Sequence, residues 1–160
     1  MIRKMDLDDA LHVCRNLRKR SVAGIEGVRF TLNTQEFAIE RFNTEGLKLT
    51  AVAADGTPVG IGGLELTSPG VWTGWVVGTD RWNECGPEII WHARKLVRKM
   101  LKEGDVCQRI QALCVTDDEG ARRYLELIGF TFEGAMRKVR KDFGDMSMYS
   151  IISDDFKVAA

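Results

Sequence analysis

The chain has few of the residues that build metal centres or disulfide frameworks. Its 160 residues include only two histidines and four cysteines, and the cysteines form no Cys-x-x-Cys pair and no regular spacing. We therefore expect neither a metal site nor disulfides, and we interpret the cysteines as reduced, mostly buried thiols. The cysteines are Cys14, Cys85, Cys107 and Cys114, and the histidines are His12 and His92.

The chain also lacks an excess of either charge and a long apolar run. Lys and Arg together number 23, as do Asp and Glu, so no overall field favours nucleic acid or an anionic membrane. Such a partner would need a local patch. The longest uncharged stretch, residues 66–79, is too short and too rich in Gly and Pro to span a bilayer. Residues 1–9 lack the apolar core of a signal peptide, so we expect a cytoplasmic protein with no membrane partner.

What is present fits one domain over residues 1–160. Apolar residues recur at helical spacing from Leu7 to Leu17, and a second helix is predicted from Asn33 or Thr34 to Gly46. Between them, residues 21–32 contain Gly24 and Gly27 and are predicted to form a mobile loop.

Three strands and a long helix are predicted next. Residues 47–54, 58–66 and 71–77 are separated by Asp-Gly and Ser-Pro-Gly turns, which predicts an antiparallel meander. Residues 87–102 form the clearest helix, with a proline suited to its first position, Gly104 suited to its exit, and one strongly basic face.

The last third alternates strands and a helix. Residues 109–115 are predicted to form a strand, and Thr116, Asp117 or Asp118 caps the following helix. Two closing strands are predicted at residues 131–132 and 147–152.

The segment Asp118-Glu-Gly-Ala-Arg-Arg-Tyr-Leu-Glu-Leu-Ile-Gly-Phe130 resembles the GNAT acyltransferase superfamily. In that family a helix of pattern Asn-x-x-Ala-x-x-x-Tyr-x-x-x-Gly-Phe closes one side of the acetyl-coenzyme A cleft. Asp118 stands where the family has Asn, and Leu125 where it often has Tyr. The resemblance implies an α+β, three-layer fold. Its central mixed, mostly antiparallel sheet has six to seven strands with a splayed fourth and fifth strand, flanked by about four helices.

The family's phosphate loop, Arg/Gln-x-x-Gly-x-Gly/Ala, corresponds to Arg81-Trp-Asn-Glu-Cys-Gly86. The resemblance implies that Arg81, Glu84, Cys85 and Gly86 contact the cofactor diphosphate through the loop and the helix end. Glu84, however, replaces a glycine and would face two phosphate charges. A like-charge contact at ~4 Å costs about 4 kcal/mol at a near-surface dielectric.

The resemblance also implies that the pantetheine arm lies as an added strand beside Trp75, Val76 and Val77. Gly74 or Gly78 is predicted either to form a bulge that exposes amides there or to relieve strand packing near the neighbouring tryptophans.

The catalytic candidates are two carboxylates. Glu65 interrupts an apolar strand and is the candidate base, with a solvent-facing position as the alternative. Asp118 stands at a position that contacts pantetheine in the family, and it is also explained as a helix cap. Leu125 cannot donate a proton, and Tyr124 is interpreted as a core residue because it points about 100° away on the helix.

Two functions follow from the resemblance. The ending Gly129-Phe-Thr-Phe-Glu-Gly-Ala-Met-Arg137 is similar to ribosomal-protein N-terminal acetyltransferases. It implies acetyl transfer from acetyl-coenzyme A to a primary amine, either a protein N-terminus or a small amine. The alternative is a GNAT-like phage or prophage protein with a structural role, since Asp80-Arg-Trp82 with the basic helix also resembles internal virion proteins. The partners would be the thioester and the amine, a second copy, or a virion.

Three groups of basic residues have more than one interpretation: Arg94, Lys95, Arg98 and Lys99; Arg122 and Arg123; and Arg137, Lys138, Arg140 and Lys141. A solvated surface explains them in most proteins, while contact with the adenosine 3′-phosphate, nucleic acid or an acidic protein is the functional alternative.

Overall fold

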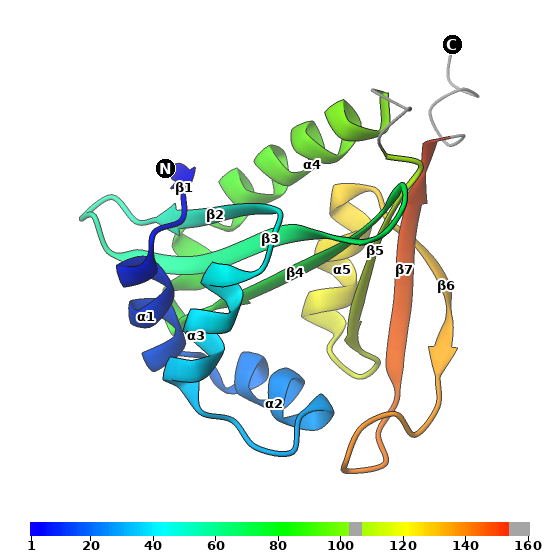
Figure 1. The fold of residues 1–160 in the computed structure, drawn as a ribbon, viewed down its shortest axis with the longest axis horizontal. Coiled ribbons are helices and arrows are strands. Elements are labelled where there is room, and N and C mark those ends of the chain that lie inside the picture. The colour runs from blue at the N-terminus through cyan, green and yellow to red at the C-terminus, as the bar shows by residue number, and fades with distance from the viewer. Residues whose placement is uncertain (103–106, 154–160) are drawn as a thin grey trace.

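The computed structural model describes residues 1–102 and 107–153, which form a seven-stranded mixed sheet with helices on both faces (Figure 1). The strand order is β1-β2-β3-β4-β5-β7-β6. The strands are β1 (Ile2–Lys4), β2 (Leu47–Val52), β3 (Pro58–Ser68), β4 (Val71–Gly78), β5 (Arg109–Val115), β6 (Thr131–Met136) and β7 (Met146–Ile152). The helices are α1 (Leu7–Arg15), α2 (Lys19–Val28), α3 (Thr34–Asn43), α4 (Gly86–Lys102), α5 (Glu119–Ile128) and the short 3₁₀ helix η1 (Asp80–Glu84).

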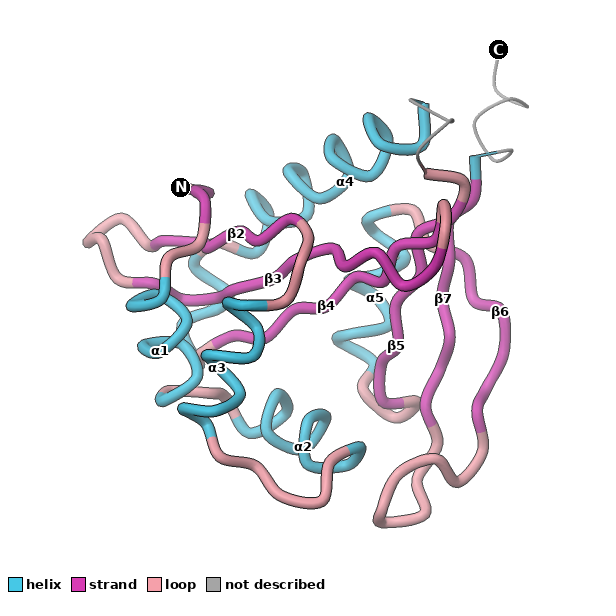
Figure 2. Tube along the Cα trace, in the orientation of Figure 1, coloured by secondary structure: helices cyan, strands magenta, loops and turns pink. Residues whose placement is uncertain are grey.

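The helices cover the two faces of the sheet with separate cores. On one face, α1 and α3 pack against β3 and β4, burying Val13 and Phe37 beside Ile61 and Val77. On the other face, α4 and α5 pack against β5 and β7 (Figure 2). No helix of the described residues is both long and apolar enough to cross a membrane.

Local sequence signals set the helix ends as predicted. Asn33 caps α3 by accepting hydrogen bonds from the N–H groups of Gln35 and Glu36. Asp118 caps α5 by accepting from Ala121 N–H at 2.9 Å. Gly129 ends α5 in the left-handed region at φ 116°, which glycine adopts without a Cβ penalty.

The sheet splits between β4 and β5, as the resemblance implied. These parallel strands pair only from Val71↔Arg109 to Gly74↔Ala112. β4 then continues to Gly78 beside β3, while β5 continues to Val115 beside β7. Figure 1 shows the two strands diverging, with α2 below the opening.

Several sequence predictions need correction. Of the predicted mobile loop, residues 21–28 belong to α2 instead, where Ile25 and Gly27 are buried, and residues 29–32 lie outside any helix or strand. With α2, the described residues contain five α-helices, in agreement with the predicted fold of about four flanking helices. A short first strand, β1, was not predicted, and β6 is longer than residues 131–132. Gly104 lies outside the described residues.

The predicted bulge at Gly74 or Gly78 is also wrong. The register between β3 and β4 runs unbroken from Gly60↔Gly78 to Leu66↔Trp72. Gly78 instead makes room for the indole of Trp82, because a Cβ there would lie 2.5 Å from the ring. Gly60 has the same role at 2.5 Å. The packing alternative predicts Trp72 and Trp75 as the neighbours. At Gly78 the neighbour is Trp82 instead, and a Cβ at Gly74 would meet only Leu64 and Gln111, at 3.4 Å or more.

Candidate functional site

The edge of β4 is open where β5 leaves it. Opposite residues in an antiparallel pair alternate between hydrogen-bonded and non-bonded pairs. Thr79 N–H donates to Val59 C=O at 2.9 Å, so Val59 and Thr79 form a hydrogen-bonded pair. By the alternation, Gly60↔Gly78 and Gly62↔Val76 are then pairs without hydrogen bonds between their backbones. The N–H and C=O of Val76 therefore point away from β3, into the gap that β5 has vacated. An extended ligand could pair with these groups as an added strand.

Trp75 and Val77, the neighbours of Val76, place their side chains in the core between the sheet and helices α1 and α3. Val77 is buried and Trp75 packs against the same cluster beneath α1 and α3. Their backbone groups pair with β3 by the same alternation. Of the three residues implied to contact pantetheine, Val76 is the one whose backbone faces the gap.

The N-terminus of α2 closes the far end of the gap. Arg18 N–H donates to Gly78 C=O at 3.0 Å, and the Ser21 hydroxyl lies 3.4 Å from both Gly78 N and Gly78 O. These contacts take the place of a β5 partner at the last residue of β4. The gap is thus bounded by β4, β5 and α2.

A cationic pocket lies beside this helix end. It has a volume of about 340 Å³ and lies between the start of α2 and η1. No side chain caps α2, and its first turn has no acidic residue, so the helix dipole adds to the positive charge. Burial lowers the pKa of the Arg18 guanidinium, which stacks 4.7 Å above the Trp82 ring. The pocket is lined by Arg18, Lys19, Arg20, Asp80, Trp82 and Asn83.

The presumed phosphate loop is closed on itself. Arg81 forms a fork with Glu84, with Nε and Nη2 at 2.7 and 2.8 Å from its two oxygens, and Nη2 also bonds Asp55 at 2.9 Å. The hydrogen bonds to Glu84 raise the pKa of Arg81 and lower that of Glu84. The three side chains sum to one negative charge, which disfavours a diphosphate at this point.

Three of the six backbone N–H groups of residues 81–86 are also already hydrogen-bonded. The N–H groups of Arg81, Trp82 and Cys85 donate to Thr79 Oγ1, Thr79 O and Trp82 O, respectively. Proline at position 87 has no N–H. The short 3₁₀ helix therefore uses amides that the family directs at phosphate.

Cys85 and Gly86 contribute little chemistry in this arrangement. Cys85 is buried and its Sγ donates to Val52 O at 3.5 Å. Burial is the main cause that raises its thiol pKa, so the thiolate is disfavoured. A Cβ at Gly86 would meet no atom within 4 Å, so no neighbouring group requires glycine there.

Glu65 lies on the α3 side of the sheet in an ion pair. Its Oε1 is 2.6 Å from Arg41 Nη1, and its side chain is 24% exposed. Arg41 also stacks over Trp75 at 5.3 Å and pairs with Glu40. This network explains how a carboxylate sits half-buried in an otherwise apolar strand.

Asp118 joins α5 to α2 across the mouth of the gap. Besides capping α5, its Oδ1 lies 3.5 Å from Arg20 Nη1. Arg20 also fills the space above Gly120, where a Cβ would lie 2.3 Å from its Nη1. Asp118 therefore caps α5, as expected from the sequence, and also pairs with Arg20 of the pocket lining.

Tyr124 packs against the core, as predicted from the sequence, and it also lies beside the pocket. Leu125 is buried in the core, whereas the Tyr124 ring contacts Trp82 edge-on at 5.9 Å between centroids, beside the pocket. Its phenol makes no hydrogen bond within residues 1–102 and 107–153, and burial raises its pKa. The sequence feature that could have indicated this contact is Trp82 in the phosphate-loop segment. Its indole is buried and packs against Tyr124 of α5.

The same described ranges contain no group of three His, Cys, Asp or Glu side chains that could hold a metal ion. All four thiols are free and buried, and burial raises the pKa of Cys14 and Cys114 to about 11.

The closed loop predicts a specific titration. In Arg81→Met the pKa of Glu84 should rise towards the ordinary glutamate value, because its main cause of lowering is the bond from Arg81. Carbon-detected NMR titration of side-chain carboxyls would measure this. Glu133 is the control, since Arg109 and Ser150 hold its pKa at about 2. An unchanged Glu84 midpoint would contradict the closed loop.

Comparison with solved structures identifies the fold. A GNAT-family acetyltransferase from Bacillus anthracis is 20% identical, with a TM-score of 0.71 over 96% of this chain and 94% of that one. The ribosomal-protein-S5-alanine acetyltransferase from Vibrio fischeri is 14% identical, with a TM-score of 0.68 over 96% and 93%. A phosphinothricin acetyltransferase from Sinorhizobium meliloti, in complex with AcCoA, is 11% identical, with a TM-score of 0.72 over 95% and 87%.

No protein-family model and no curated protein sequence matches the chain. The similarity therefore lies in the fold rather than in the sequence. With its seven-stranded mixed sheet and its parallel, parting β4 and β5, this chain has the fold of the GNAT acetyltransferases.

Proposed function

We propose that the protein is an N-acyltransferase that uses acetyl-coenzyme A and a primary amine. The observation that carries the proposal is the gap between β4 and β5, with the backbone of Val76 directed into it. The acceptor is a protein N-terminus or a small amine. The similar structures named above include enzymes named for ribosomal-protein-S5-alanine and for phosphinothricin, so both acceptor classes occur in this fold.

The cofactor diphosphate would be held by α2 rather than by the phosphate loop. The loop offers a negative charge and few free amides. The pocket beside it combines an uncapped helix end with Arg18, Lys19 and Arg20, and such helix ends bind phosphate readily. Asp118 would position Arg20 for this contact. We therefore assign diphosphate binding to these three cations.

Bound acetyl-coenzyme A would supply an activated acetyl thioester. Transfer to an amine needs a group that takes a proton from the amine and one that donates a proton to sulfur. We assign the donor to Tyr124, which remains protonated and has no competing partner in the described residues. Glu65 stays a prediction as the base, since its carboxylate would first have to leave Arg41.

The first test compares two sets of cations. Arg20→Gln should weaken coenzyme A binding about tenfold or more, because a hydrogen bond to a charged group contributes about 1.5–3 kcal/mol. Arg81→Gln should change affinity less than twofold (about 0.4 kcal/mol), because Arg81 is already bound to Glu84 and Asp55. Isothermal titration calorimetry would measure both. A larger loss in Arg81→Gln than in Arg20→Gln would contradict the assignment.

The second test addresses Tyr124. Tyr124→Phe should lower kcat about 100-fold, within the range of general acid catalysis, and leave coenzyme A affinity unchanged. Steady-state kinetics with a panel of amines would measure kcat. The free energy of unfolding is the control, and it should change by less than about 0.5 kcal/mol, because the phenol has no hydrogen bond to lose. An unaltered kcat would exclude Tyr124 as the donor.

The closed phosphate loop favours a second candidate function, a GNAT-fold protein with a structural or interaction role. The ion pairs of Arg81 with Glu84 and Asp55 support it. A ligand at 100 times its dissociation constant would add about 2.7 kcal/mol of stability. If millimolar coenzyme A gives no thermal shift, in the wild type or in Glu84→Gly, the structural role is favoured. If Glu84→Gly binds coenzyme A and the wild type does not, the closed phosphate loop is the reason that the wild type does not bind.

A further inference from the structure

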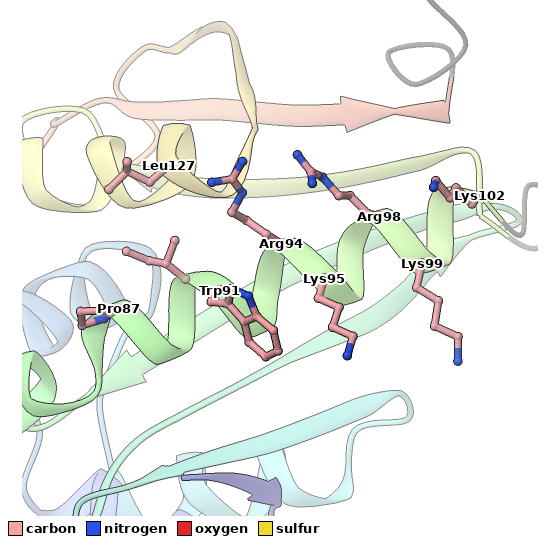
Figure 3. Close-up of a pocket in the computed structure, with 9 residues that line it drawn as sticks. Pro87, Trp91, Arg94, Lys95, Arg98, Lys99, Lys102 and Leu127 are labelled. Carbon is pink, nitrogen blue, oxygen red and sulfur yellow. The ribbon is translucent and has the colours of Figure 1, made fainter. Parts of the chain in front are cut away.

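A groove with a strongly basic lining runs along the outer side of α4, beside α5. It has a volume of about 790 Å³ (Figure 3). Arg94 and Arg98 lie on the side of the helix that faces α5, and Lys95 and Lys99 lie on the opposite side. From Arg94 to Lys102 the helix rises about 12 Å. All five cations of the groove are exposed: Arg94, Lys95, Arg98, Lys99 and Lys102.

Four of these five charges are not neutralised by a neighbouring carboxylate of the described residues. Within residues 1–102 and 107–153, Arg94, Lys95, Arg98 and Lys102 take part in no ion pair. Like charges four residues apart destabilise a helix, and the groove lining holds three such pairs. The helix dipole favours Lys99 and Lys102 in the last turn, but it does not account for Arg94, Lys95 and Arg98 in the middle of the helix.

The groove also presents flat and apolar surface among the cations. Trp91 is 62% exposed, and Leu127 of α5 is 45% exposed on the facing wall. Lys95 Nζ lies 5.3 Å from the centre of the Trp91 ring. Among the four tryptophans, Trp82 is buried and Trp72 and Trp75 are half-buried. Trp91 is therefore the exposed aromatic platform of this surface.

We propose that the α4 groove binds single-stranded nucleic acid, with phosphates on the cations and a base stacked on Trp91. A positive groove with an exposed aromatic side chain is the arrangement that binds single strands without sequence preference. A duplex keeps its bases stacked and would leave Trp91 unused. An acidic peptide would engage the cations but has no planar group to cover the indole.

The proposal is independent of acyl transfer. It uses the outer side of α4, whereas the proposed cofactor contacts lie at α2 and in the gap beside β4. The balanced net charge of the chain is compatible with it, because five of the 23 basic residues line this one groove and form a local patch.

The test is binding of a labelled oligothymidylate of about 15 nucleotides, a length near the upper end of common site sizes. Fluorescence anisotropy at several salt concentrations gives the affinity, and tryptophan emission reports on Trp91. With four phosphate contacts, the logarithm of the affinity should fall with the logarithm of salt at a slope of about −2.8. Binding should also quench tryptophan emission, and Trp91→Phe should remove most of the quenching.

A matched pair of triple variants separates the groove from overall charge. Arg94→Gln/Lys95→Gln/Arg98→Gln should weaken binding about tenfold or more and reduce the salt slope by about 2. The control, Lys4→Gln/Arg15→Gln/Arg137→Gln, removes three exposed cations elsewhere that form no ion pair in the described part of the chain. It should bind within about twofold of the wild type. Circular dichroism checks that α4 still folds.

Four outcomes would overturn the proposal. The first is no oligothymidylate binding at low salt, and the second is an equal loss in the control variant. The third is equal affinity for polyglutamate without quenching, which would identify an acidic peptide surface instead. A duplex that binds more tightly than the single strand would likewise exclude the proposed occupant.

Discussion

The short parallel pairing of β4 with β5 is the constraint on which the rest of this structure depends. Only four residue pairs join the two strands before they part. Each strand then stays with its antiparallel neighbour, so beyond Gly74 the sheet divides into β1–β4 and β5–β7. A backbone edge buried in the middle of a sheet costs free energy unless its polar groups find partners. The N-terminus of α2 satisfies Gly78, and Val76 is left facing the gap.

The charges around this gap are arranged differently from those expected from the phosphate-loop motif. Arg81 is the one residue of the loop with the expected charge, and the replacement of glycine by Glu84 supplies its partner within the same turn. Positive charge lies instead across the opening, at the start of α2, where Arg18 stacks on Trp82 and Arg20 pairs with Asp118. An exposed ion pair contributes only about 0–1 kcal/mol to stability, so the consequence of the Arg81–Glu84 pair is mainly for binding.

Much of the fold could be predicted from local signals. The meander follows from its two turns, α4 from its amphipathic pattern, and the caps Asn33 and Asp118 from their side-chain chemistry. The helix α2 was missed because Gly24 and Gly27 lower its propensity, and tertiary packing of Ile25 overrides that preference. The site was harder to predict. That Glu65 meets Arg41 and that Tyr124 meets Trp82 depends on residues far apart in the sequence.

Amide hydrogen exchange at Val76 tests the central claim most directly. If the strands part after Gly74, the Val76 N–H has no ladder partner and should exchange at least about a hundredfold faster than those of Trp75 and Val77, which pair with β3. NMR-detected exchange resolves these three neighbouring amides in one experiment. Protection of Val76 equal to that of Trp75 and Val77 would mean that β4 and β5 stay paired along their length, and the gap would not exist.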